Sequence, residues 1–164
     1  MTKKKKSVVG LENEVRDAMP LEVKDVFDKI KDAAKELAFA KTGKNDWTTD
    51  QIIAKASYIA NLKPFLSGYK NHVGYLHDKL KWDIDQKERT AIAQSRRASK
   101  SIADSERLAE DKVWKKRKDE LELEAAYRFL RDFLRDVEQG ITVSQTRVGN
   151  IRSEKFEANL PTPR

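Results

Sequence analysis

The longest regular run of hydrophobic positions in the chain extends from Leu123 to Ile151. Apolar side chains recur there at steps of three and four, the spacing that puts residues on one face of an α-helix, and Ser144 interrupts them. The pattern predicts a long helix with a continuous contact surface. We call this surface the C-terminal seam, and it consists of Leu123, Tyr127, Leu130, Phe133, Leu134, Val137, Ile141, Val148 and Ile151.

A second apolar row lies on an adjoining face of the same predicted helix. It comprises Leu121, Ala125, Phe129 and Phe133. A helix that is apolar on two faces needs partners on two sides. A length of about 43 Å is large for one small domain, so we expect part of the seam to contact a second copy of the chain. The alternative is an ordinary core helix. Gly140 either ends this helix as a C′ residue or lies inside it at a cost of about 1 kcal/mol.

Three further helical patterns precede this one. Residues 21–41 carry apolar side chains at helical spacing, and Thr48 with Gln51 forms a capping box that predicts the start of another helix. Pro64 then either kinks a continuous helix or begins a new one, because proline lacks an N–H and clashes one turn back. The spacing resumes at once and predicts a helix over about 63–93.

The composition fits an all-helical protein. Ala, Glu, Lys, Leu and Arg account for 76 of the 164 residues, a proportion typical of long helices and coiled coils. The low apolar content predicts a thin core, so we expect an all-α protein with long helices in a helical hairpin or coiled-coil arrangement, assembled as a homo-oligomeric ring. The absence of cysteine is consistent with a reducing cytosol, and no apolar run is long enough to span a membrane.

The net charge of +7 is unevenly distributed. Residues 87–100 include five basic side chains and one acidic one, whereas residues 119–140 include seven acidic and three basic ones. Alanine and serine separate the cations, so a phosphate backbone could approach them closely. This basic segment predicts a DNA-binding site made of Lys87, Arg89, Arg96, Arg97 and Lys100, unless it is simply a solvated helix face.

Aromatic residues lie near the cations but not among them. Trp82 flanks the basic segment and is a candidate for base stacking. Trp114 lies among five cations of a later helix, whose N-cap is predicted to be Asp104 or Ser105. Its position on the second apolar row favours a packing role over a stacking role.

These patterns divide the chain into five parts. In order, they are a basic flexible arm (1–20), a helical extension (21–43), a helical DNA-binding region (47–101), a helical oligomerisation region (102–158) and a disordered tail (159–164).

The sequence lacks the usual signatures of catalysis. It has no P-loop, no cysteine and no converging set of histidines and carboxylates. His72 and His77 are five residues apart, so on a helix they diverge, and we interpret them as surface residues. We therefore expect a protein that is not an enzyme and binds no metal or cofactor.

From about Trp47 to Ala158 the sequence resembles the UvsY-type recombination mediators of tailed phages. Lys87-x-Arg89 resembles the Lys-x-Arg DNA-contact motif of that family, although Glu88 separates the cations and the match needs a one-residue shift. Residues 1–40 extend beyond the usual start of the family. The C-terminal helix carries most of the resemblance, through Ala103-Asp104, Leu130-x-Asp132-Phe133, Ile141, Ile151 and Phe156-Glu157-Ala158.

The resemblance implies a function that the residue patterns alone do not define. It implies a heptameric ring that binds single-stranded DNA and displaces the single-strand-binding protein. It also implies that the ring helps to load a RecA-like recombinase, in the cytoplasm of the infected host cell. The alternative is a structural coiled-coil phage protein, either a scaffold or a nuclease-inhibitor-like protein that binds DNA ends.

Overall fold

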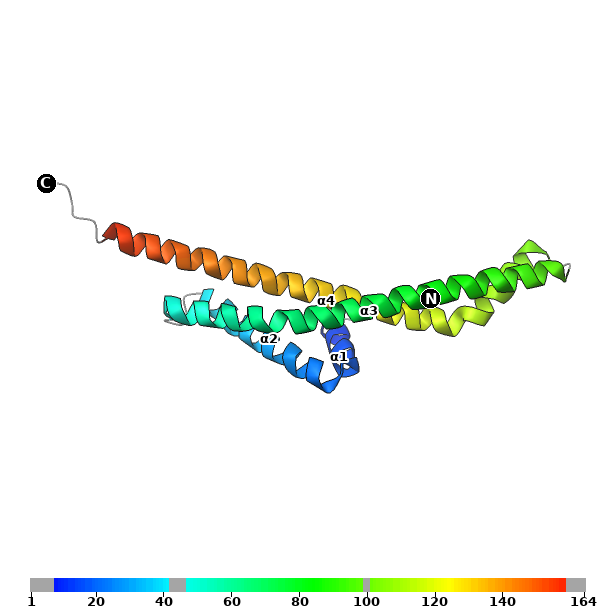
Figure 1. Cartoon of the computed structure of the whole chain (residues 1–164), viewed down its shortest axis with the longest axis horizontal. Coiled ribbons are helices and arrows are strands. Elements are labelled where there is room, and N and C mark those ends of the chain that lie inside the picture. The colour runs from blue at the N-terminus through cyan, green and yellow to red at the C-terminus, as the bar shows by residue number, and fades with distance from the viewer. Residues whose placement is uncertain (1–7, 42–46, 99–100, 159–164) are drawn as a thin grey trace. The chain divides into compact units, whose positions relative to one another are not determined.

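The protein is all-helical throughout the part of the chain that the structure describes. The computed structural model describes residues 8–41, 47–98 and 101–158, and these contain no strand. The predicted all-α class is therefore confirmed. The helices are α1 (Val8–Ala18), α2 (Leu21–Lys41), α3 (Thr49–Arg97) and α4 (Ile102–Ala158) (Figure 1).

Side-chain caps define where the two long helices begin. The Thr48 N–H donates to Gln51 Oε1 at 2.8 Å and the Gln51 N–H donates to Thr48 Oγ1 at 3.3 Å, which confirms the predicted capping box. Helix α4 begins after Ser101, because the Asp104 N–H donates to Ser101 Oγ at 3.1 Å. The predicted caps, Asp104 and Ser105, instead lie inside the first turn of α4.

Neither Pro64 nor Gly140 ends a helix. Of the two alternatives predicted at Pro64, the continuous helix is the one observed, and α4 likewise continues through Gly140. Buried apolar positions continue on both sides of Pro64, at Ile59 and Leu66, so packing holds this part of α3 together despite the missing backbone hydrogen bond. Tertiary contacts thus outweigh the local preferences of both residues.

The chain forms two compact units, 1–68 with 131–164 and 69–130. In the first unit, α1, α2, the start of α3 and the end of α4 surround a core that includes Phe27, Ile30, Leu37 and Ile59. The ring of Phe27 lies 4.6 Å from that of Phe133 between centroids, which joins α2 to α4. The ion pair between Lys63 and Glu138, at 2.6 Å, joins α3 to α4.

Helix α1 corrects the prediction of a flexible arm over residues 1–20. Val15 and Met19 are buried, and Arg16 donates two hydrogen bonds to the Asp28 carboxylate of α2, at 2.7 and 2.6 Å. Lys31 also pairs with Glu12. The apolar residues of this segment are few, but they lie four apart and so reach α2 from one helix face. The four lysines at positions 3–6 lie outside the described residues.

The second unit is an antiparallel pair made of the end of α3 and the beginning of α4 (Figure 1). Ion pairs connect the two helices, between Lys116 and Asp83 and between Arg117 and Glu88. Buried residues line the contact at Val73, Ile84 and Ala91 on α3 and at Ala109, Val113 and Leu130 on α4. The predicted helical hairpin therefore describes this unit.

Part of the C-terminal seam is covered by the chain itself. Leu130, Leu134, Val137 and Val148 are buried, and the other five seam residues are half-buried. Apolar side chains of α2 and α3 cover part of it, since the Phe27 ring lies 4.6 Å from that of Phe133, and Leu37 and Ile59 line one hollow with Val137. Contact of the half-buried seam residues with a second copy of the chain stays a prediction.

Candidate nucleic-acid interface

The predicted DNA-binding cations do not share one surface. Arg89, Arg96 and Arg97 are exposed on α3, and none of them forms an ion pair within the described residues. Lys87 is also exposed, but its Nζ lies 3.6 Å from Asp83 Oδ2. Lys100 falls outside the described residues.

Lys87 belongs to a small charge cluster between the two helices of the second unit. The Asp83 carboxylate pairs with both Lys116 and Lys87, and the hydrogen bond from Lys116 lowers the pKa of Asp83. The adjacent Lys116 ammonium lowers the pKa of Lys87. Two cations therefore share one carboxylate, and Lys87 is already engaged inside the protein.

No helix end occurs near Gln86, because α3 continues to Arg97. Ala91 is buried beyond that point, so the helix still has a packed face after the large apolar residues stop. On a continuous helix, side chains two residues apart diverge by about 200°. Lys87 and Arg89 thus point to different sides of α3 and cannot act together as the Lys-x-Arg motif implies.

A different set of side chains shares the outward face of α3. We call it the outer stripe: Tyr75, Lys79, Trp82, Arg89 and Arg96. Tyr75, Trp82, Arg89 and Arg96 follow one another at seven-residue steps, the spacing that keeps side chains on one face of a packed helix. The side chains of Tyr75 and Trp82 are 62% and 65% exposed.

The outer stripe lies opposite the packed face of α3. Trp82 is two residues from the buried Ile84, and Arg89 is two residues from the buried Ala91, so each points about 200° away from the contact with α4. The intervening positions of the row, Gln86 and Ala93, are uncharged. The row therefore combines cations and aromatic rings without a carboxylate.

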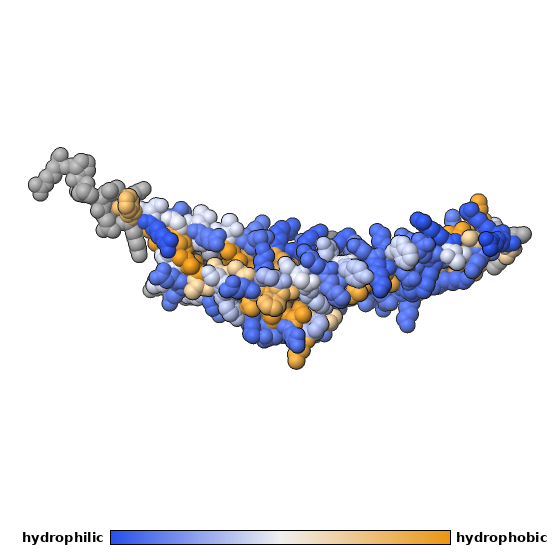
Figure 2. Space-filling view, in the orientation of Figure 1, coloured by the Kyte–Doolittle hydropathy of each residue, from blue (hydrophilic) through white to orange (hydrophobic). Residues whose placement is uncertain are grey.

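Two carboxylates border the outer stripe. Asp85 lies 3.7 Å from Arg117 of α4, which partly neutralises it. Asp78 Oδ1 lies 3.0 Å from His77 Nδ1 and is otherwise open to solvent. His72 is exposed, and the His77 side chain is 18% exposed, so His77 reaches the surface only in part. Hydrophilic side chains cover most of the visible face of this unit (Figure 2).

The sequence contains a signal for the outer stripe that a run of adjacent residues does not show. The basic segment over 87–100 leaves out Tyr75 and Trp82, which precede it. Counting in steps of seven from Arg96 backwards gives Arg89, Trp82 and Tyr75. This spacing shows an interleaving of aromatic and basic residues that the basic segment by itself lacks.

Trp114 differs from its predicted packing role. Its side chain is 73% exposed and lies at the edge of a hollow that also includes Glu88, Glu106 and Glu110. Three carboxylates against one nearby guanidinium, that of Arg117, disfavour an anionic ligand. Trp114 is thus about as exposed as Trp82, but it borders a hollow that is lined by more carboxylates than cations.

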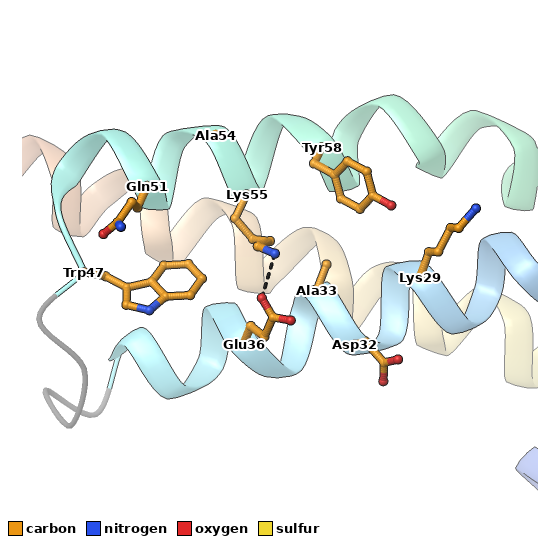
Figure 3. A pocket seen from close by; sticks show the side chains of 9 residues that line it. All are labelled: Lys29, Asp32, Ala33, Glu36, Trp47, Gln51, Ala54, Lys55 and Tyr58. Atoms are coloured by element: carbon orange, nitrogen blue, oxygen red, sulfur yellow. Dashed lines mark ion pairs between the residues drawn. The ribbon is translucent and has the colours of Figure 1, made fainter.

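An open hollow in the first unit lies between α2 and α3 (Figure 3). It contains Trp47 and Tyr58 together with two lysines. Lys55 pairs with Glu36 at 2.6 Å and lies 6.0 Å from the centroid of the Trp47 ring, and Lys29 pairs with Asp25 at 2.6 Å. Because both cations already have carboxylate partners, this hollow offers no unmatched charge to a phosphate.

Metal binding and membrane spanning find no support in the described residues. They contain no group of three or more histidine, cysteine or acidic side chains arranged to hold a metal ion. No described helix combines the length and apolar content that a membrane crossing needs.

The fold and the outer stripe define a class, an all-α protein with heptad-packed helices and an exposed basic and aromatic helix face. No protein-family model, curated protein or solved structure matches the chain. The class therefore depends on the fold and on the outer stripe alone.

Proposed function

We propose that this protein binds single-stranded DNA and acts, without catalysis of its own, as a recombination mediator. The observation that supports the proposal is the outer stripe, in which Lys79, Arg89 and Arg96 have no ion-pair partner among the described residues. Cations without protein partners are the groups that phosphates can bind, because no internal ion pair must first be broken.

The length of the outer stripe suits an extended strand. Tyr75 and Arg96 lie 21 residues apart on one helix, which corresponds to about 32 Å. A straight row of this length can contact several phosphates in succession. Each contact is weak, so useful affinity requires that many sites act on one strand.

The mediator part of the proposal depends on the resemblance to the UvsY-type family. That resemblance suggests a homo-oligomeric ring, a heptamer in the family, which would repeat the outer stripe in each subunit. The suggested protein partners are a RecA-like recombinase and the single-strand-binding protein that it replaces. Because four residues of the C-terminal seam are buried within the chain, contacts between subunits would have to use its half-buried residues or other exposed side chains.

The first prediction tests the DNA contact. Replacing Arg89 and Arg96 with alanine should weaken binding to a labelled single-stranded oligonucleotide. The slope of log affinity against log salt should fall by about 1.4 for each subunit engaged, since each single-strand phosphate contact contributes about 0.7. Fluorescence anisotropy over a salt series measures both effects.

Two controls make this result specific. Arg131→Ala with Arg135→Ala removes the same charge from exposed positions on α4 and should change the slope far less. Lys87→Ala should also have little effect, because Lys87 is engaged with Asp83. If the unchanged protein fails to bind even at low salt, the DNA-binding proposal is wrong and the structural coiled-coil alternative gains support. Native mass with and without the oligonucleotide reports subunit number in the same samples.

A further inference from the structure

We propose that the outer stripe holds an unpaired strand by its bases as well as by its phosphates, with bases stacked on Tyr75 and Trp82. The inference rests on the proposed nucleic-acid binding and specifies how the strand is bound. Its ligand is the unpaired nucleotide irrespective of base sequence, because every base has a flat π face.

The exposure of the two rings supports this assignment. Large aromatic side chains normally bury their apolar faces, and each ring left in water forgoes the free energy that burial would give. Tyr75 and Trp82 nevertheless remain 62% and 65% exposed while smaller residues of α3, such as Val73 and Ala91, fill the contact with α4. The second unit thus packs without the flat faces of these rings.

The order of side chains along the row fits a polynucleotide. Tyr75 and Trp82 are separated by about 10 Å along the helix axis, and Lys79 lies between them. Arg89 and Arg96 continue the row on the same face. A single strand presents bases and phosphates in alternation, so rings interspersed with cations can bind both parts of it.

Duplex DNA fits this surface less well. Its bases are already stacked on one another, so a helix can contact only their edges in a groove and the phosphates, and not their π faces. The arginines would contact a duplex, whereas the two rings would have no base to cover. Preference for unpaired over paired strands therefore follows from the aromatic positions and not from the charge.

The test compares normal and abasic oligonucleotides of equal length, which share the phosphate backbone but differ in their bases. The protein is used as the full chain. Tyr75→Leu with Trp82→Leu should weaken binding of the normal oligonucleotide at least about tenfold, since stacking contributes about fivefold to 150-fold for each base. The salt slope should stay unchanged, because no phosphate contact is removed. The unchanged protein should bind the abasic strand as weakly as this variant binds the normal one.

Matched variants separate stacking from folding and from general hydrophobic binding. Trp114→Leu removes an equally exposed tryptophan beside carboxylates and should leave affinity unchanged. Trp82→Phe keeps an aromatic face, so this variant should retain much of the affinity that the unchanged protein has for the normal oligonucleotide. In a variant with Trp47→Phe and Trp114→Phe, the emission of Trp82 should be quenched by the normal strand and not by the abasic one.

The outcomes distinguish this inference from the proposed function. Equal binding of normal and abasic strands, with loss of affinity only in the Arg89 and Arg96 variant, would overturn stacking and leave DNA binding intact. The single variants Trp114→Leu and Trp82→Leu are also compared. An equal loss of affinity for the normal oligonucleotide in both would overturn base stacking on Trp82. Absence of binding to either strand at low salt would end both proposals.

Discussion

At the scale of single residues, the helix face decides which cations are available to a ligand. Lys87 and Arg89 are separated in the sequence by Glu88 alone, yet Lys87 pairs with Asp83 whereas Arg89 has no partner among the described side chains. Glu88 pairs with Arg117 of α4, which removes it from the outer stripe. Three consecutive charges thus have three different roles.

The second residue-scale feature is the ion pair that joins α1 to α2. The Asp28 carboxylate accepts two hydrogen bonds from Arg16, and these bonds lower the pKa of Asp28 below its ordinary value of 3.8. A carboxyl group with a lower pKa in the folded state stabilises the fold at pH values above its ordinary pKa. This contribution is lost as the pH falls through the lower, folded-state pKa.

We therefore expect Asp28→Asn to lower the melting temperature near neutral pH. The difference from the unchanged protein should shrink as the pH falls below 3.8 and through the lower folded-state pKa, where the Asp28 carboxylate of the folded protein becomes protonated. Thermal unfolding followed by circular dichroism over a pH series measures this. Asp32→Asn, in an exposed pair with Lys35, serves as the control. A difference that grows in acid would contradict the assignment.

At the scale of the helices, α3 shows how packing outweighs local preference. It includes Pro64, Gly68 and Gly74, each unfavourable inside a helix, and still continues without a break from Thr49 to Arg97. Gly74 has a packing reason, since a Cβ atom there would lie 2.9 Å from the Tyr127 ring of α4. No atom lies within 4 Å of the corresponding position at Gly68.

The two glycines therefore make a matched pair for a stability test. Gly68→Ala should stabilise the protein by about 1 kcal/mol, because alanine is the better helix former and meets no neighbour. Gly74→Ala should gain less or lose stability, because the half-buried Tyr127 must move. Urea unfolding of both variants gives the comparison. An equal gain for the two would mean that the Tyr127 ring does not restrict Gly74.

At the scale of the whole molecule, each unit has its own apolar core along a heptad-packed helix contact. Leu130 is fully buried in the second unit, whereas Leu121, nine residues earlier on the same helix, is 58% exposed. The buried residues of the C-terminal seam stabilise the fold of one chain. Substituting them therefore tests folding stability and not subunit contacts. A charged residue at Leu130 would unfold the protein before it could reveal subunit contacts.

A milder pair of substitutions separates these roles. Leu130→Ala should destabilise the chain by about 2–5 kcal/mol, through lost burial and the cavity left behind. Leu121→Ala should change stability by less than about 0.5 kcal/mol, because its side chain is mostly in water. Urea unfolding measures the first effect, and native mass shows whether Leu121 instead contributes to subunit contacts. Similar destabilisation by both substitutions would show that Leu121 is buried in solution.

The sequence by itself determined most of the elements, with the exception of α1. Steps of three and four predicted helices over 21–41 and 123–151, which correspond to α2 and to part of α4, and the capping box placed the start of α3 at Thr48. These features depend on residues close together in the chain, so local periodicity and hydrogen bonding suffice to predict them. The composition predicted the all-helical class, because Ala, Glu, Lys, Leu and Arg make up a share of the chain that is typical of long helices.

Only the tertiary structure decided which faces of those helices stay exposed. The sequence could not show that α2 and α3 cover part of the C-terminal seam or that α1 packs on α2 through Val15, Met19 and Arg16. It also placed Trp114 in a core and Lys87 in the binding site, because amphipathic periodicity identifies rows of residues without identifying their partners. Burial depends on contacts between segments distant in sequence, and those contacts left Tyr75, Trp82, Arg89 and Arg96 together on the open side of α3.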